Sequence, residues 1–366
     1  MRIAYTCQDI SVAGGLERIL VDKANAMAAR GHDVCMIVNN PPGSRSAYAL
    51  HPDVKFVDIS LPQPEGLYGT LRFKWRQNAA IRRALKSFRP DIVVGVPSWL
   101  TWSILFAPAR LVLESHNARS MVFISERRSA YKRLKVAVAE RRAAAVVALT
   151  REDAAAWTNT ASVKVIPNFS NVACAENGAT RHGAVAVGRL VEQKDFSLLI
   201  EAWGIVAQRH PDYPLRIFGE GPLLEDLSQR IATAGLEKSV ALEGRTSDVA
   251  AIYAASDFLV MSSAHEGLPL VLIEAMQCGC PCVATDCKCG PREIISDGSD
   301  GLLVPYRDLS QDERARALAE AICRLIENPE QRRNFGAKAR ENAARFSKEN
   351  IMDRWEQLFK DITACG

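Results

Sequence analysis

Long apolar runs are missing from this chain of 366 residues. No stretch approaches the ~18–20 consecutive apolar residues that a membrane-spanning helix needs, so the sequence predicts no such helix. The N-terminus also lacks the apolar core and the small-residue cleavage site of a signal peptide. We therefore expect the chain to stay in the cytoplasm, with its ten cysteines as reduced thiols rather than a disulfide framework.

Several common binding signatures are missing as well. The sequence contains neither the G-x-G-x-x-G pattern of dinucleotide-binding folds nor the G-x-x-x-x-G-K-[ST] pattern of P-loop enzymes. It has no helix-turn-helix motif, no RNP-type motif, no short-period repeat and no low-complexity tract. No carboxylate pair resembling a metal-binding D-x-D stands at a strand end in the first half of the chain, which argues against a metal site of that kind.

The charge of the chain is uneven, although its composition is ordinary for a globular protein. Hydrophobic residues make up 48% and charged residues 24%, and the length fits two domains of ~100–200 residues. The formal charge is +4, yet residues 65–142 alone carry +11 and the remainder carries −7. This asymmetry indicates nucleic acid, anionic lipid or a phosphorylated partner, and solvated basic helix faces would also produce it.

Short apolar runs alternate with longer helical patterns twice along the chain, which predicts two doubly wound parallel sheets. The polar stretch over residues 167–183 shows no periodicity and predicts a linker. We therefore predict an α/β chain with two Rossmann-like domains, residues 1–166 and residues 184–346, facing each other across a cleft. A final helix is expected over residues 347–366.

Two candidate features lie in the first half. AGGLERIL places Gly14 and Gly15 between a strand and a helix, where the bare backbone and the helix N-terminus can approach an anion. A plain tight turn would explain the same pair of glycines. ESHNAR places His116 at the end of a buried-type strand, where it can donate a hydrogen bond to a sugar hydroxyl or a developing charge, although a structural histidine is the alternative.

Two further features lie in the second half. GRLVEQK carries Arg189 and Lys194 on a loop that leads into a helix, an arrangement that suits a diphosphate or, alternatively, a simple surface pair. HEGLPLVLIEAM carries Glu266 before a helix and Glu274 inside it, where a carboxylate can accept both hydroxyls of a ribose. Backbone groups near the start of this helix are also expected to contact the ligand. They belong to Gly267, Leu268, Leu270 and Val271.

These motifs, together with FGEGP and GPREII, resemble the retaining glycosyltransferases of family 4, which have the GT-B fold. The resemblance covers nearly the whole chain and is strongest over residues 184–304. Within that family the chain is most similar to bacterial enzymes that extend glycans linked to undecaprenyl diphosphate. The resemblance implies a hexosyltransferase that uses a nucleotide sugar and needs no metal ion or other cofactor.

The resemblance also implies roles for single residues. Gly15 would let its loop approach the diphosphate of the sugar donor, and His116 would hydrogen-bond the transferred sugar. Arg189 and Lys194 would neutralise the diphosphate and stabilise the leaving nucleotide. Glu266 would contact the sugar of the donor, and Glu274 would bind the ribose. The last helix would return to the first domain.

Five cysteines between Cys278 and Cys289 follow the pattern C-x-C-x-C-x4-C-x-C. A zinc site is one interpretation. The spacing differs from the usual C-x2-C ligand pair, so we favour buried or redox-sensitive thiols.

A basic, aromatic helix is predicted within residues 69–90, which contain seven Lys or Arg and no acid. Such a helix can lie on an anionic membrane surface and meet a polyprenyl-diphosphate-linked glycan acceptor. An ordinary core helix with a solvated basic face is the alternative. The residues expected to contact the acceptor and the membrane are Arg72, Lys74, Arg82 and Arg83.

The sequence therefore favours a glycosyltransferase at the cytoplasmic membrane face, with a UDP-sugar (N-acetylhexosamine or hexose) as the sugar donor. A transferase that uses a GDP-mannose-type donor or a soluble acceptor, such as a sucrose-phosphate or glycogen synthase, is the alternative within the same fold. A nucleic-acid-binding protein is the alternative from another class. It would leave the four motifs unexplained, and we expect no nucleic-acid partner.

Overall fold

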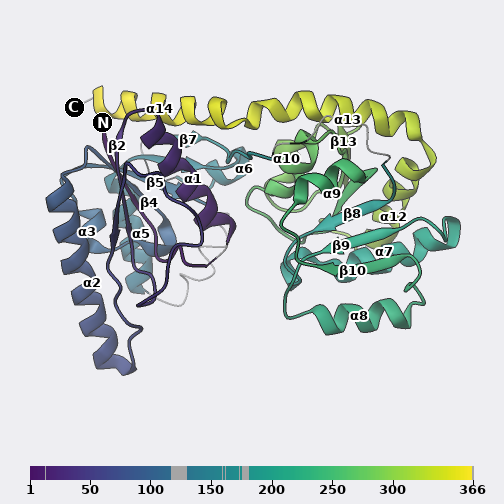
Figure 1. Cartoon of the computed structure of the whole chain (residues 1–366), viewed down its shortest axis with the longest axis horizontal. Helices are drawn as coiled ribbons and strands as arrows, with labels where there is room; N and C mark the ends of the chain where they lie inside the picture. Colours follow the sequence, from purple (N-terminus) through teal and green to yellow (C-terminus); the bar gives the residue numbers. More distant parts are fainter. Residues whose placement is uncertain are drawn as a thin grey trace. The chain divides into compact units, whose positions relative to one another are not determined.

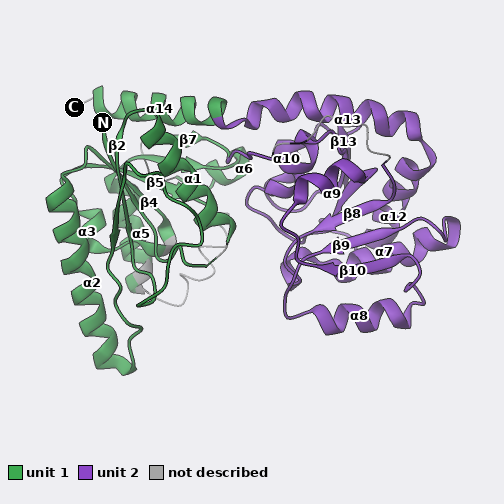
Figure 2. Cartoon of the chain, in the orientation of Figure 1, with its two compact units in different colours: residues 1–167, 349–366 green, residues 168–348 purple. Residues whose placement is uncertain are grey.

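A computed structural model describes the protein at residues 1–12, 14–116, 130–158, 160, 162–172, 174 and 181–364 (Figure 1). The chain forms two compact units, shown in green and purple in Figure 2. Unit 1 comprises residues 1–167 and 349–366, and unit 2 comprises residues 168–348. The described part of the predicted linker after residue 167 thus belongs to unit 2.

Unit 1 is built on a parallel sheet that, within the described residues, has seven strands in the order β3-β2-β1-β4-β5-β6-β7. Short runs of β-branched and other apolar residues form the central strands, which are buried on both faces as expected for parallel strands covered by helices. The strands are β1 (Arg2–Thr6), β2 (Asp33–Val38), β3 (Val54–Asp58), β4 (Ile92–Gly95), β5 (Arg110–Ser115), β6 (Ala143–Ala148) and β7 (Val163–Val165).

Helix α2 covers this sheet with one face only. Ile81, Leu85 and Phe88 recur at helical spacing and are buried with strand residues such as Val93 and Leu113. The helix begins three residues before the predicted segment. The helices of unit 1 are α1 (Gly15–Ala29), α2 (Gly66–Phe88), α3 (Trp102–Leu105), α5 (Ala130–Arg142), α6 (Arg151–Ala154) and α14 (Lys348–Ala364), with a 3₁₀ turn, η1 (Pro97–Trp99).

Unit 2 repeats the architecture with a parallel sheet of six strands, counted over the described residues, in the order β10-β9-β8-β11-β12-β13. Its strands are β8 (Ala184–Val187), β9 (Leu215–Phe218), β10 (Val240–Gly244), β11 (Phe258–Met261), β12 (Cys282–Thr285) and β13 (Gly301–Val304). Its helices are α7 (Phe196–Arg209), α8 (Leu224–Thr233), α9 (Val249–Ala255), α10 (Leu270–Gln277), α11 (Pro291–Ile294), α12 (Gln311–Glu327) and α13 (Pro329–Ala343), with 3₁₀ turns η2 (Glu192–Lys194) and η3 (Ala344–Phe346). The predicted pair of parallel α/β folds is confirmed.

The strand order reverses once in each sheet, between β1 and β4 in unit 1 and between β8 and β11 in unit 2. Ligands of open parallel sheets bind at the carboxyl ends of the strands beside such a reversal. In unit 1 that edge carries the loop from β1 to Gly14. In unit 2 it carries the loops that follow β8 and β11, and these are the loops that hold GRLVEQK and HEGLP.

Among the described helices, none combines enough length and apolar character to cross a membrane.

Candidate active site

The loops after β8 and β11 bring Lys194 and Glu266 into direct contact. Lys194 Nζ donates to Glu266 Oε1 at 2.6 Å, and the Ser263 hydroxyl donates to the same oxygen at 2.6 Å. Glu266 is 7% exposed and the Lys194 side chain is 17% exposed, so the ion pair is largely removed from water. Both residues are candidates from the sequence, and the structure adds that Lys194 and Glu266 pair directly with each other.

A second set of hydrogen bonds ties these two loops together. The Gln193 side chain donates to the His265 carbonyl at 3.0 Å, and the Ser262 hydroxyl donates to the Lys194 carbonyl at 2.9 Å. Gln193, Ser262 and Ser263 were not predicted from the sequence. The signal that could have found the serines is their position directly after the buried strand β11, at the edge where ligands bind.

Arg189 lies on the same loop but is exposed, and its side chain makes no ion pair with any described residue. The loop itself is held against FGEGP, since the Leu190 N–H donates to the Glu220 carbonyl at 2.9 Å. A Cβ added at Gly221 would lie 2.7 Å from the Leu190 carbonyl carbon, so only glycine permits this approach. The backbone of Arg189 is therefore fixed while its guanidinium remains available to an anion.

Helix α10 begins directly after the GLP segment. Its N-cap residue is Pro269, and no side chain of a described residue caps this end, so the first backbone N–H groups of the helix are available to an anion. Gly290 lies close to this segment and has a φ of +92°. A Cβ added at Gly290 would lie only 2.5 Å from Pro269 Cδ, so no other residue fits there. Leu268 is buried, and the expected contact residues Gly267, Leu270 and Val271 are half-buried.

Glu274 lies on the buried face of α10 and is 7% exposed. The Tyr253 hydroxyl of α9 donates to its Oε2 at 3.4 Å. Burial and the neighbouring charge of Glu274 both raise the pKa of Tyr253, so the phenol stays protonated and can donate this bond. The carboxylate is thus oriented from one side by Tyr253.

In unit 1, Gly14 is the N-cap residue of α1, and its carbonyl accepts a hydrogen bond from the Tyr48 hydroxyl at 2.9 Å. A Cβ added at Gly15 would meet no described atom within 4 Å, so open space lies beside this first helical residue. The helix has no side-chain cap among the described residues. Its N-terminal N–H groups are therefore available, as the sequence predicts for an anion site.

His116 follows the last residue of β5, and its Nε2 lies 3.0 Å from Glu114 Oε1. The distance suits an ion pair, although the two groups are not aligned for a regular hydrogen bond. Glu114 is fully buried and was not predicted as a site residue. The available signal was the motif ESH itself, because residues two apart in a strand share one face. The rest of that motif, residues 117–119, lies outside the described part.

The cysteines of the segment 278–289 do not behave as one group. The Cys280 thiol donates to the Ser256 carbonyl at 3.9 Å, and the Cys282 thiol donates to the Cys280 carbonyl at 3.6 Å. Burial raises the pKa of Cys280 and of Cys287 to about 12, which disfavours the thiolate that a metal ion or a nucleophilic reaction needs. These contacts support the interpretation of buried thiols.

Cys278 differs, because it forms a disulfide with Cys174, and the two Cα atoms lie 5.1 Å apart. The expectation of ten reduced thiols was therefore wrong for this pair. The two residues are 104 positions apart, and sequence spacing cannot show that residue 174 returns to the C-terminal end of α10. The bond ties the start of unit 2 to the helix that carries Glu274.

We expect reduction of the Cys174–Cys278 disulfide to lower the free energy of unfolding by about 3–5 kcal/mol, since a bond that closes a long loop restricts the unfolded chain. Thermal unfolding with and without dithiothreitol measures the effect. The double variant C174S/C278S should have the unfolding temperature of the reduced parent. That temperature should not change when dithiothreitol is added. Its control, C323S, removes a buried free thiol and should keep the response. Equal unfolding temperatures of the parent in both buffers would contradict the prediction.

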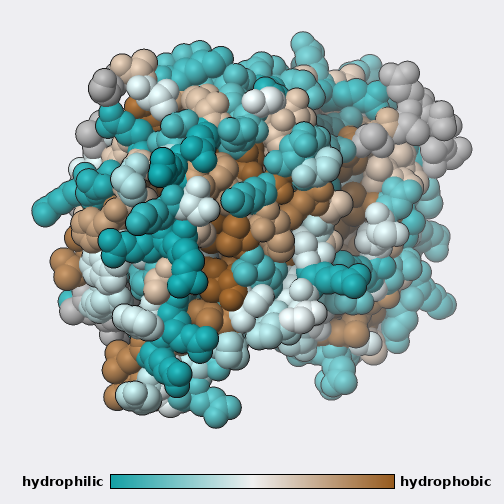
Figure 3. All heavy atoms as spheres, turned by 60° about the vertical axis from the view of Figure 1, so that its left-hand side comes forward, coloured by the Kyte–Doolittle hydropathy of each residue, from teal (hydrophilic) through white to brown (hydrophobic). Residues whose placement is uncertain are grey.

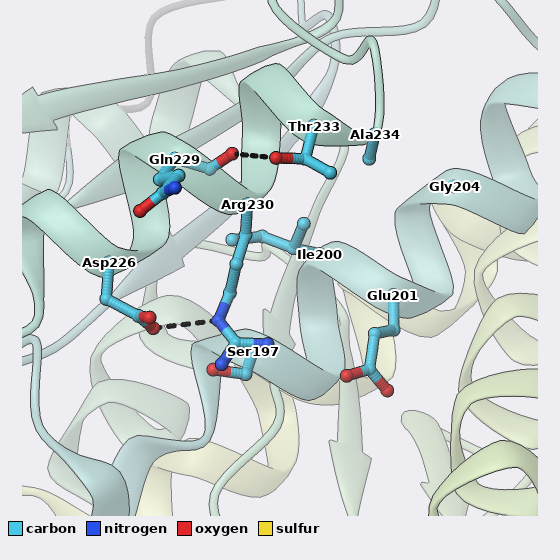
Figure 4. A pocket seen from close by; sticks show the side chains of 9 residues that line it. All are labelled: Ser197, Ile200, Glu201, Gly204, Asp226, Gln229, Arg230, Thr233 and Ala234. Atoms are coloured by element: carbon cyan, nitrogen blue, oxygen red, sulfur yellow. Dashed lines mark hydrogen bonds and ion pairs between the residues drawn. The ribbon is translucent and has the colours of Figure 1, made fainter.

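Grooves also lie away from these residues. In unit 2, a groove of about 410 Å³ between α7 and α8 is lined by polar side chains such as Glu201, Asp226 and Arg230 (Figure 4). Arg230 donates to Asp226 at 2.7 Å across one turn of α8, so its charge is already paired. The groove contains none of the predicted site residues.

Another groove, in unit 1, has a volume of about 1450 Å³ and runs between the C-terminal half of α2 and the segment 102–108. Arg82 and Arg83 line it, whereas Arg72 and Lys74 lie on the exposed surface nearer the start of α2. The groove's other charged and aromatic residues are Trp75, Lys86, Arg89, Asp91, Trp102 and Phe106. Figure 3 brings this side of unit 1 forward and shows apolar surface interspersed with hydrophilic surface.

Family models match both halves of the chain. Residues 13–173 match the model described as Glycosyltransferase Family 4, and residues 178–342 match the model described as Glycosyl transferases group 1. Two doubly wound units, each built on a parallel sheet, have the architecture of the GT-B fold. The chain belongs to these glycosyltransferases, and the family, the fold and the enzyme class predicted from the sequence are confirmed.

Curated relatives cover the chain to different extents. An exopolysaccharide phosphotransferase of Streptomyces coelicolor is 39% identical over 48% of this chain but only 18% of its own length. The amylovoran biosynthesis glycosyltransferase AmsD of Erwinia amylovora is 29% identical over 95% of this chain and 97% of its own. A Campylobacter jejuni α-1,4-N-acetylgalactosaminyltransferase, named for a diphospho-undecaprenol-linked GalNAc substrate, is 24% identical over 99% of both chains.

Solved structures share the fold at low identity. TarM superposes with a TM-score of 0.81 at 16% identity and 98% coverage of both chains. Anabaena HepE, solved in complex with UDP, superposes with a TM-score of 0.75 at 21% identity, with 99% of this chain and 100% of that chain covered.

Proposed function

We propose that this glycosyltransferase transfers an N-acetylhexosamine or hexose from a UDP-sugar to a glycan linked to a polyprenyl diphosphate. The observation that carries the proposal is the cluster at the β8/β11 edge, where Lys194, Glu266 and the uncapped end of α10 lie beside a fixed Arg189 loop. Such a set of cations and backbone N–H groups suits a nucleoside diphosphate. The UDP-bound relative HepE supports uridine as the nucleotide.

The acceptor side of the proposal rests on unit 1. The groove beside α2 combines basic side chains with the indole rings of Trp75 and Trp102, which suits a diphosphate attached to an apolar chain. The surface that continues along α2 exposes Leu67, Tyr68 and Leu71 at 60–81% of their area, beside Arg72 and Lys74. Apolar and basic residues together favour an anionic membrane surface, on its cytoplasmic face. The name of the Campylobacter relative, which includes diphospho-undecaprenol, supports this class of acceptor.

The chemistry we propose is retaining and independent of a metal ion. The acceptor hydroxyl attacks the anomeric carbon from the side of the leaving diphosphate. The bond from that carbon to the phosphate oxygen breaks, and the departing phosphate takes up the hydroxyl proton. Lys194, Arg189 and the N-terminus of α10 stabilise the negative charge that develops on the leaving group, which is where electrostatic catalysis has its largest effect. Full turnover in excess chelator is the corresponding test.

We expect the loss of four basic residues from α2 to weaken binding to anionic vesicles by several kcal/mol at most, because each contributes about 1 kcal/mol near such a surface. The effect should shrink at high salt. KM for the lipid-linked acceptor should rise, while affinity for the UDP-sugar stays unchanged. Sedimentation with anionic vesicles and acceptor kinetics measure these effects. The variant replaces by serine the residues Arg72, Lys74, Arg82 and Arg83.

The matched control removes four exposed basic residues of unit 2, so the change in net charge is identical. Those residues are Lys238, Arg245, Arg333 and Lys338. The control should bind vesicles as the parent does. If the α2 variant also binds vesicles and acceptor like the parent, α2 is an ordinary helix with a solvated basic face, and an enzyme with a soluble acceptor becomes the better assignment.

A further inference from the structure

A buried charge network lies behind His116, and the proposed chemistry does not use it. Lys23 of α1 forms an ion pair with Glu114 of β5, and both side chains are 0% exposed. The Lys23 Nζ also lies 4.8 Å from the ring centre of Trp355 on α14. Three elements far apart in the sequence therefore enclose one ion pair, and His116 is the member of the network nearest to solvent.

Stability does not explain why such a pair is present. Each buried ion costs several kcal/mol of lost hydration, and well-packed apolar residues in place of such a pair are often equally or more stable. The pair does keep a negative charge beside His116. Burial alone would raise the pKa of Glu114, but its contacts with Lys23 and His116, the charge of Lys23 first, outweigh burial and lower it to about 2. Glu114 is therefore a carboxylate at any physiological pH.

A carboxylate can only accept hydrogen bonds, so it favours a proton over a lone pair on the imidazole nitrogen that faces it. That nitrogen is Nε2 of His116, 3.0 Å from Glu114 Oε1. In neutral imidazole the second nitrogen then has a free lone pair. Around Glu114, the described titratable groups that act on it are Lys23 from α1 and His116, and Tyr5 of β1 senses its charge.

We propose that Glu114 is a positioning residue that holds a proton on Nε2 of His116, so that Nδ1 accepts a hydrogen bond from a sugar hydroxyl of the substrate. Lys23 keeps Glu114 charged, and Trp355 closes the network from α14. The proposal rests on the proposed function and on the contact between His116 and the transferred sugar that the family resemblance implies. It also specifies that contact as one in which the substrate hydroxyl donates.

The test compares E114Q with the double variant K23M/E114Q. Glutamine has the shape of glutamate, but its amide can donate to Nε2 and so favour the other tautomer. We expect E114Q to lower kcat about 100-fold without changing affinity for the UDP-sugar. The single variant leaves a buried lysine without its counter-charge and so loses stability. The double variant removes both charges and should regain stability, but not turnover.

The ¹⁵N chemical shifts of the His116 ring report the tautomer directly, and comparison with H116N assigns this ring among the six histidines. The parent should show the proton on Nε2, and both E114Q and K23M/E114Q should show it moved to Nδ1 or shared. As a control, D153N neutralises another buried acid of unit 1, one that accepts a hydrogen bond from Trp157. It should keep the parental turnover and tautomer.

The possible results distinguish the role of Glu114 from the role of His116. A double variant that regains both stability and turnover would show that the network only joins α1, β5 and α14. Loss of turnover in H116N combined with normal turnover in E114Q would overturn the positioning role alone. Normal turnover in H116N would remove His116 from the proposed function, and the role of Glu114 would fall with it.

Discussion

Replacing Lys194 by methionine is expected to lower kcat by about 10²–10³-fold, the usual cost of removing one group that stabilises charge in a transition state. The ammonium group is largely buried, and Glu266 holds it in place within reach of the β8/β11 edge. Negative charge on the diphosphate increases as the sugar leaves. Lys194 should therefore matter more to kcat than to the binding of the intact sugar donor.

Steady-state kinetics and calorimetric titration with UDP distinguish the two roles. If Lys194 only holds the ground state, KM rises while kcat stays constant. The double variant K194M/E266Q tests the ion pair, because K194M alone leaves a carboxylate without its counter-charge. Restored stability in the double variant would show that the unpaired carboxylate causes any loss of stability in K194M. The matched control is K238M, which removes an exposed lysine of the same unit. Parental kcat in K194M would refute the leaving-group role.

The sequence predicts which loops lie together at one sheet edge better than it predicts the contacts between their side chains. Lys194 and Glu266 could be placed at one sheet edge because each follows an apolar strand, and parallel strands end on the same side. Their contact depends on side-chain conformation, and the chain carries no spacing signal for it. The same limit applies to Gln193, which joins the two loops through the His265 carbonyl.

The helical spacing of apolar residues in α1 could have shown that Lys23 is buried. Lys23 recurs at helical spacing with Ile19, Leu20 and Met27, all of which are buried in α1. A lysine in an apolar stripe predicts a buried acidic partner. Glu114, an acidic residue in the otherwise apolar strand β5, is a candidate for that partner. Pairing the two from sequence alone requires the fold, since 91 residues separate them.

Local sequence patterns do not predict which cysteines form a long-range disulfide. Five cysteines crowd into the segment 278–289, yet only Cys278 forms a disulfide among the described residues, and its partner lies in the segment predicted as a linker. Local density of cysteines therefore did not indicate which thiol is paired. The burial of Cys280 and Cys282 follows from their places beside and within strand β12, at the core of unit 2.

Replacing Glu274 by glutamine is expected to weaken UDP binding by about 100-fold. We propose that its carboxylate accepts hydrogen bonds from both ribose hydroxyls, and a hydrogen bond to a charged group contributes about 1.5–3 kcal/mol. Glu274 is 7% exposed on α10 and is oriented by the Tyr253 hydroxyl. Glutamine preserves the shape of the side chain, so the loss should appear in affinity, with the unfolding temperature little changed.

Binding of UDP and of 2′-deoxyuridine diphosphate to the parent and to E274Q provides the decisive comparison, with the two guanosine analogues measured in parallel. A site built to bind a hydroxyl discriminates strongly against a ligand that lacks it. The parent should therefore prefer the ribonucleotide, and E274Q should lose most of that preference. The control Y253F removes only the orienting hydroxyl, 3.4 Å from Glu274 Oε2, and should give a smaller loss of affinity with the preference retained. If E274Q discriminates between the two nucleotides as strongly as the parent, Glu274 does not bind the ribose, and its carboxylate serves only the packing between α9 and α10.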